Sequence, residues 1–179
     1  MRTVLLAAVA LLAAAPLAVT QNEPTPPPPN NPGGGYGVPY CNGKTNSLGC
    51  TPAVRDSEGD PWNGPHVVWA EGVVPGQPAV LLYSVAGPAA IPFGGATLCL
   101  MAPVRRGPAT VTEGLSRGCA GMVAADMQLY ATGQLGGNPA PELRKYGCSV
   151  WCQWWARDPG FPAPWNQQLS DGLRYEIPP

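Results

Sequence analysis

An alternating set of aromatic and polar side chains near the C-terminus has the composition of a ligand-binding surface. The set comprises Trp151, Gln153, Trp155 and Arg157. Alternate residues of a β-strand point to one face, so a strand over residues 150–157 would present all four together. Indole rings stack on sugar rings, and Gln and Arg hydrogen-bond to hydroxyl groups. We predict that this face contacts a polysaccharide or a cell-surface partner. The alternative is that the loop from Phe161 to Trp165 folds back and covers the indoles.

The sequence also contains the GxSxG pattern of a serine hydrolase at Gly114–Gly118, centred on Ser116. In that fold a strained strand-to-helix turn exposes the serine, and the catalytic histidine follows it in the chain. The only histidine, His66, precedes Ser116. We therefore predict a turn beside Cys119 with no catalytic residue, and we expect His66 to be a strand-end residue rather than a general base.

Three carboxylates alternate in a predicted turn at Asp56, Glu58 and Asp60. Carboxylate oxygens at such spacing bind calcium in some loops. Because the other ligands of an EF-hand loop are missing, we predict a solvated acidic turn and no metal.

Asp126 and Asp158 are candidates for the paired acids of a glycosidase. The sequence gives no distance between them. For Asp158, at the end of a predicted strand, we favour a bond from its side chain to the backbone of the following turn, with Arg157 pairing locally.

Six cysteines follow the N-terminal segment: Cys41, Cys50, Cys99, Cys119, Cys148 and Cys152. An even number of cysteines in an exported chain predicts up to three disulfides. There is no CxxC pair, so we predict neither a thiolate metal site nor any other cofactor.

The most local disulfide pairs are Cys41 with Cys50 and Cys99 with Cys119, and we predict both. Cys148 and Cys152 remain. An extended strand separates residues four apart by about 13 Å, whereas a bridge needs Cα atoms within about 7 Å. Either the chain turns at residues 147–149, or the pairing is different.

Residues 1–20 have the pattern of a signal peptide. Arg2 precedes an apolar run from Val4 to Leu12 that continues to Val19, and cleavage is expected near residue 20. Residues 21–35, QNEPTPPPPNNPGGG, form a Pro/Gly-rich spacer that is stiff first and flexible after. The domain then covers residues 36–179. We expect a secreted or periplasmic protein, with the extracellular space favoured.

Composition favours an all-β domain. Removal of Arg2 leaves nine basic and eleven acidic residues, which indicates no affinity for nucleic acid or for anionic membrane surfaces. The chain contains 24 Pro and 23 Gly, so few windows suit a helix. Short apolar runs bounded by turn residues predict strands and an antiparallel β-sandwich of jelly-roll or Ig-like type. The runs are 66–74, 79–87, 96–102, 149–157 and 172–177.

Residues 121–133 fit either secondary structure, because Ala, Met and Gln also favour helices. We predict a strand. On it Val123, Ala125, Met127 and Leu129 would face inward, and Asp126, Gln128 and Tyr130 outward.

The C-terminal third carries two linked motifs. Gln153, Trp155 and the run Arg157–Pro159 form a QxWxRDP motif, and Leu169–Ile177 forms an LSxGLxxxI motif. With these motifs the chain resembles a family of uncharacterised bacterial secreted domains that often end larger extracellular proteins. The resemblance implies a secreted β domain and transfers no activity.

The sequence thus predicts a non-catalytic extracellular binding or structural module. The alternatives are a secreted enzyme of glycoside hydrolase type acting on polymers, and a self-assembling envelope protein. Concentration-dependent light scattering distinguishes self-assembly from binding of a ligand.

Overall fold

The computed structural model describes residues 37–57, 64–115 and 118–177. The predicted signal peptide and spacer lie outside this part of the chain. The described residues form eleven strands, one α-helix and one 3-10 helix. In chain order the elements are β1 (Val38–Tyr40), β2 (Ala53–Asp56), β3 (Val67–Glu71), β4 (Pro78–Ser84), β5 (Pro88–Phe93), β6 (Ala96–Leu100), β7 (Arg105–Val111), β8 (Met122–Asp126), α1 (Met127–Ala131), η1 (Pro141–Arg144), β9 (Ser149–Arg157), β10 (Gln167–Leu169) and β11 (Gly172–Glu176).

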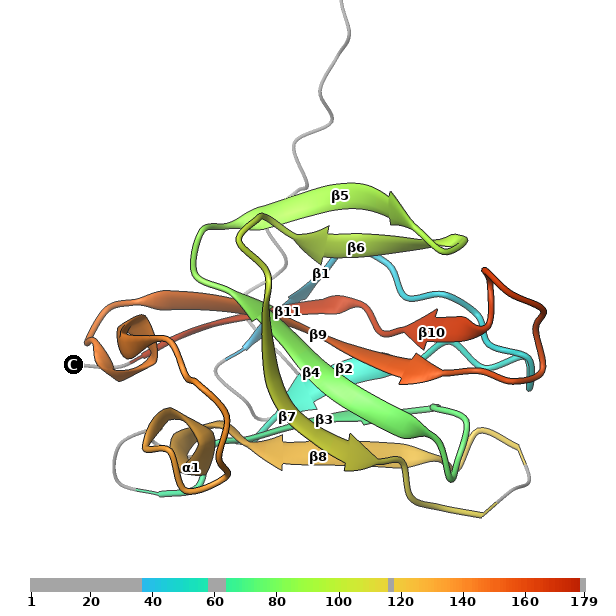
Figure 1. Cartoon of the computed structure of the whole chain (residues 1–179), viewed down its shortest axis with the longest axis horizontal. Coiled ribbons are helices and arrows are strands. Elements are labelled where there is room, and N and C mark those ends of the chain that lie inside the picture. Colours follow the sequence, from blue (N-terminus) through green and yellow to red (C-terminus); the bar gives the residue numbers. More distant parts are fainter. Residues whose placement is uncertain (1–36, 58–63, 116–117, 178–179) are drawn as a thin grey trace, which may run out of the picture.

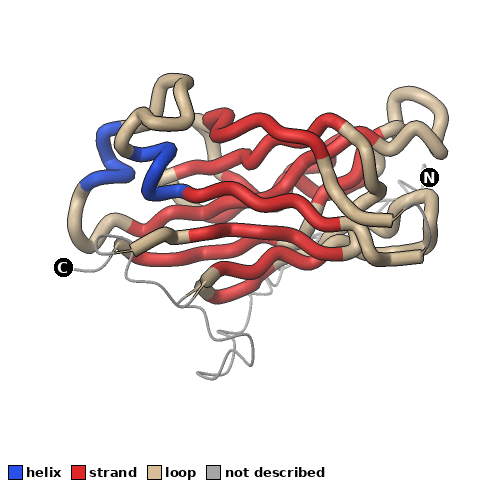
Figure 2. The backbone as a smooth tube through the Cα atoms, turned by 90° about the horizontal axis from the view of Figure 1, so that it is seen from below, coloured by secondary structure: helices blue, strands red, loops and turns tan. Residues whose placement is uncertain are grey.

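The strands form three antiparallel layers (Figure 1). The main sheet has the order β1-β11-β9-β4-β7, and β10 pairs with β9 beside it. The sheet β2-β3-β8 lies on one side of the main sheet, and the β5–β6 hairpin lies on the other. Both helices lie at one end of the strands (Figure 2). This arrangement confirms the predicted all-β, disulfide-containing sandwich.

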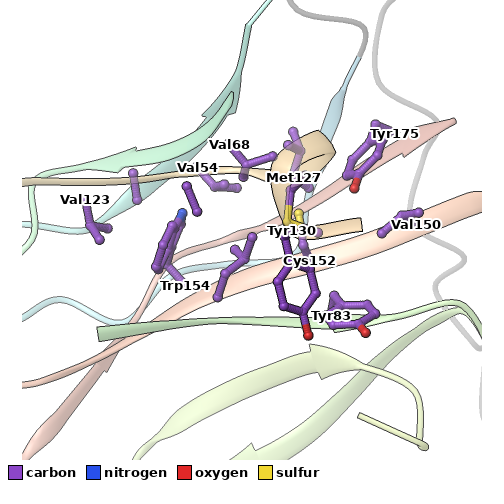
Figure 3. Packing of buried hydrophobic residues seen from close by; sticks show 14 of the residues in the cluster. Val54, Val68, Tyr83, Val123, Met127, Tyr130, Val150, Cys152, Trp154 and Tyr175 are labelled. Carbon is purple, nitrogen blue, oxygen red and sulfur yellow. The ribbon is translucent and has the colours of Figure 1, made fainter. Parts of the chain in front are cut away.

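The main core lies between the main sheet and the β2-β3-β8 sheet (Figure 3). β9 contributes the four residues predicted to form its inner face, namely Val150, Cys152, Trp154 and Ala156, and all are buried. The smaller sheet contributes Val54, Val68 and Val123 to the same cluster. Burial of each large apolar side chain contributes about 1.5–3 kcal/mol, and this core fixes which face of β9 points outward.

The prediction of one strand over residues 121–133 is wrong in its second half. β8 ends at Asp126, whose Oδ1 accepts hydrogen bonds from the N–H groups of Gln128 and Leu129 and so caps α1. The helical period then places Met127 and Tyr130 in the core, although Tyr130 was predicted to face outward. No helix among the described residues is long and apolar enough to cross a membrane.

Both predicted disulfide pairs are also wrong. Cys41 is bonded to Cys99, and Cys50 to Cys119, with Cα–Cα distances of 6.2 and 5.6 Å. The loop between Cys41 and Cys50 is instead closed by Asn46, whose Oδ1 accepts from the N–H of Cys50 at 3.0 Å. Each cysteine of this loop therefore pairs with a residue far away in the chain. The first bridge ties β6 to the segment that follows β1.

Cys148 and Cys152 are free thiols. They lie at the start of β9, whose extended backbone separates residues four apart too widely for a bridge. The alternative of a different pairing is therefore correct, with two disulfides rather than three in the described residues. Burial raises the pKa of the Cys152 thiol well above its ordinary value, so Cys152 is held as an unreactive thiol.

Candidate functional site

Gln153 lies beneath the β5–β6 hairpin with none of its surface exposed (0%). Its Oε1 accepts from the N–H of Cys99 at 3.0 Å, and its Nε2 donates to the carbonyl of Thr97 at 3.0 Å. Nε2 also donates to the carbonyl of Ser170 at 2.7 Å. The side-chain amide thus pairs with β6 much as a backbone peptide group would. Its hydrogen bonds are used inside the domain, so Gln153 is removed from the predicted ligand-binding face.

Gln153 lies between the two outward-facing indoles along β9. Trp151 and Trp155 flank Gln153 on the outer face of β9, and both remain partly exposed. Because β6 passes over β9 at Gln153, the four predicted residues do not form one continuous platform. β6 covers Gln153 rather than the indoles, so the alternative in which the loop from Phe161 to Trp165 covers them stays a prediction. Arg157 is exposed, with its guanidinium carbon 5.7 Å from the centre of the Trp155 ring.

Three aromatic residues lie near the C-terminal end of β9, in β9 itself and in the β9–β10 loop, and we call them the aromatic cluster: Trp155, Phe161 and Trp165. Lys44 lies among them. Its Nζ donates to the carbonyls of Trp165 at 2.5 Å, Gln167 at 2.8 Å and Gly94 at 3.5 Å, and lies 4.8 Å from the centre of the Phe161 ring. Desolvation lowers the pKa of Lys44, opposed by the charge of Asp158. One ammonium group therefore links the hairpin tip, the β9–β10 loop and β10.

The hairpin tip packs closely against this loop at Gly94 and Gly95, which have φ values of 53° and 74°. A Cβ atom at Gly94 would lie 1.4 Å from Nε2 of Gln167, and one at Gly95 would lie 2.4 Å from Cδ1 of Trp165. Only glycine suits both the left-handed conformation and the close approach. Gln167 in turn accepts a hydrogen bond from Nε1 of Trp155 at 2.9 Å. The Trp165 side chain is thus positioned by its neighbours while Trp165 stays 51% exposed.

The two carboxylates considered for glycosidase chemistry have structural contacts. Asp158 is buried, and its side chain accepts from the N–H groups of Ser47 at 2.8 Å and Gly160 at 3.2 Å. The predicted bond to the following turn is therefore present. Asp126 caps α1 at the other end of the molecule (Figure 1). Their places at opposite ends of the sandwich do not suit a pair acting on one glycosidic bond.

Other predicted chemical residues are placed as follows. Ser116, Glu58 and Asp60 lie outside the described residues. The prediction that Asp56 lies in a solvated turn is wrong. Asp56 ends β2 and is 1% exposed, and burial raises the pKa of its carboxyl to about 6. His66 directly precedes β3, as expected of a strand-end residue.

Sequence reasoning missed Lys44 and Gln167. The bonds of Lys44 to Trp165 and Gln167 join residues 121 and 123 positions apart, and no local pattern indicates such contacts. The sequence does contain one relevant signal, the pair Gly94-Gly95 between two apolar runs. This pair indicates a tight hairpin but does not show which residues pack against its tip.

Comparisons with protein families, with curated proteins and with solved structures gave no match for this chain. The chemistry of the aromatic cluster is therefore inferred from its geometry. An exposed indole, a guanidinium beside a second indole and partly buried supporting bonds form an apolar surface with polar edges. Such a surface suits a ligand with both apolar faces and hydroxyl groups.

Proposed function

We propose that this domain is a secreted, non-catalytic binding module whose aromatic cluster contacts a polysaccharide. The observation that carries the proposal is the fixed but exposed position of Trp165. Its indole is half exposed, yet it is set in place by Gly95 at the hairpin tip and by Lys44 on its carbonyl. A ring that is already ordered loses little conformational entropy when a sugar stacks on it.

The polar groups around the cluster complement this role. Arg157 is exposed and forms no ion pair within the described residues, so its remaining donors are available to sugar hydroxyls. Trp155 and Arg157 of the predicted face remain part of the proposed surface, and Trp165 takes the place of Gln153. Trp151 lies beyond Gln153 along β9 and is not part of the surface.

The disulfide bonds agree with export of the protein. The two disulfides fit an extracellular or periplasmic protein, because such bonds persist in oxidising compartments. A binding module also needs none of the acids or nucleophiles that a hydrolase requires.

The test is a pull-down of the purified mature protein with a panel of insoluble polysaccharides, such as cellulose, chitin and xylan. We expect binding to at least one polymer. Each stacking contact contributes on the order of 1 kcal/mol, so a single site should bind with micromolar to millimolar Kd. Trp165→Ala should weaken binding about fivefold to tenfold, and Trp151→Ala should leave it unchanged. Equal losses from both variants, or no binding to any polymer, would contradict the proposal.

A further inference from the structure

A second site lies at the other end of β9. A pocket of about 190 Å³ opens between α1, η1 and the residues around the end of β11. Its walls are largely apolar, with Met127, Ala131, Leu143 and Ile177 among them. A dry apolar cavity of about 150 Å³ is enough to take up benzene. This pocket therefore has room for one aromatic ring and a small substituent.

His66 lines the pocket and carries unsatisfied hydrogen-bonding capacity. It is 1% exposed, its ring centre lies 4.4 Å from that of Tyr175, and neither ring nitrogen has a hydrogen-bond partner within the described part of the chain. Burial lowers the pKa of His66 to about 4, against the opposing effect of Asp126. The ring is therefore neutral at pH 7 and offers one donor and one acceptor. Buried polar atoms of this kind are normally hydrogen-bonded. Both ring nitrogens are almost inaccessible from the pocket, so a polar atom of a ligand pairs with them when the residues around the ring move apart.

Arg144 supplies a charge at the same pocket. It lines the pocket from the last position of η1 and is exposed. Its neighbours Glu142 and Lys145 pair with each other at 3.7 Å, while Arg144 forms no ion pair among the described residues. A guanidinium binds a carboxylate through two parallel N–H donors, so this side chain suits an anionic group at the pocket entrance.

We propose that this pocket binds a small hydroxylated aromatic carboxylate. Its ring would lie against the apolar walls, its carboxylate would pair with Arg144, and its hydroxyl group would bond to His66. The site shares no residue with the aromatic cluster and does not depend on saccharide binding.

The experiment is isothermal titration calorimetry of the purified mature protein with 4-hydroxybenzoate, together with NMR mapping of the contact. We expect saturable binding, with shift changes at His66 and Tyr175. Benzoate, which lacks the hydroxyl group, should bind about tenfold more weakly. Arg144→Gln should weaken 4-hydroxybenzoate about tenfold, whereas Arg105→Gln, an exposed arginine on β7, should not.

Ala131→Leu provides a second variant, because the larger side chain would occupy the pocket and should abolish binding. Arg144 is exposed, so its replacement keeps the test valid if the Ala131 variant does not fold. No saturable binding, shift changes confined to the aromatic cluster, or equal affinity in the Arg144 and Arg105 variants would overturn the proposal.

Discussion

Replacing Gln153 by leucine should detach the β5–β6 hairpin from the main sheet. The two side chains are similar in size, but leucine cannot make the three bonds to Cys99, Thr97 and Ser170. Each buried backbone group left without a partner costs about 1–3 kcal/mol. Three such groups give a loss of about 3 kcal/mol or more in the free energy of unfolding. If the hairpin separates from the main sheet, water can hydrogen-bond to some of these groups. The loss in the free energy of unfolding then comes from the lost packing of the hairpin.

The loss is measured by guanidinium chloride unfolding of the disulfide-intact protein. Gln134→Leu is the matched control, because Gln134 is exposed and, within the described ranges, its side chain bonds only to Oγ1 of Thr132. A change within about 0.5 kcal/mol is expected. Amide hydrogen exchange locates the effect. The N–H of Cys99 should exchange faster in Gln153→Leu, while the N–H groups of β3 should not.

A loss below about 1 kcal/mol, together with unchanged exchange at Cys99, would contradict this role of Gln153. That result would mean that the Cys41–Cys99 bridge and apolar contacts hold the hairpin without the amide. Gln153 would then be an incidental buried polar residue.

Three further predictions concern stability, covalent structure and the hairpin tip. Burial raises the pKa of the Asp56 carboxyl to about 6, so the protonated carboxyl favours the folded state. Its contribution to the free energy of unfolding is complete below the unfolded-state pKa, near 3.9, and is lost as pH rises through 6. The protein should therefore gain unfolding free energy when the pH is lowered from 8 to 5, and Asp56→Asn should make this gain smaller by about 1.4 kcal/mol. Denaturant unfolding at both pH values measures the gain, and an equal gain in the variant would contradict the raised pKa of Asp56. Mass mapping of non-reduced peptides should find Cys41 linked to Cys99 and a free thiol at Cys152, which alkylates only after unfolding; rapid labelling of the native protein would disprove its burial. Lys44→Met should weaken polysaccharide binding at least twofold, because the hairpin tip and the loop lose their shared ammonium, and unchanged isotherms would show that the bonds of Lys44 are dispensable.

The strand pattern was predictable because β9 follows a strict two-residue period. Alternation identified Val150, Cys152 and Trp154 as the core face, and the structure agrees. The outer face was not predictable in the same way. Gln153 is buried by β6, more than 50 residues away in the chain, and alternation cannot show whether a third layer covers a face.

The cap at Asp126 shows a second limit. A single carboxylate that bonds two N–H groups was enough to end β8 and start α1 within a sequence that suits either structure. The disulfides show a third limit, since the shortest spacing was not the spatial pairing. The pocket around His66 draws residues from four separate segments, so no local motif marks it.

Binding isotherms on the polysaccharide that the panel selects show whether the aromatic cluster is the binding surface. The unsubstituted protein, Trp165→Ala and Tyr146→Ala are compared, since Tyr146 is also an exposed aromatic residue but lies just before β9, at the other end of that strand. We predict that Kd rises about fivefold to tenfold in Trp165→Ala and stays within twofold in Tyr146→Ala, with both variants folded by circular dichroism. An unchanged Kd in folded Trp165→Ala would contradict the assignment of the aromatic cluster as the binding surface.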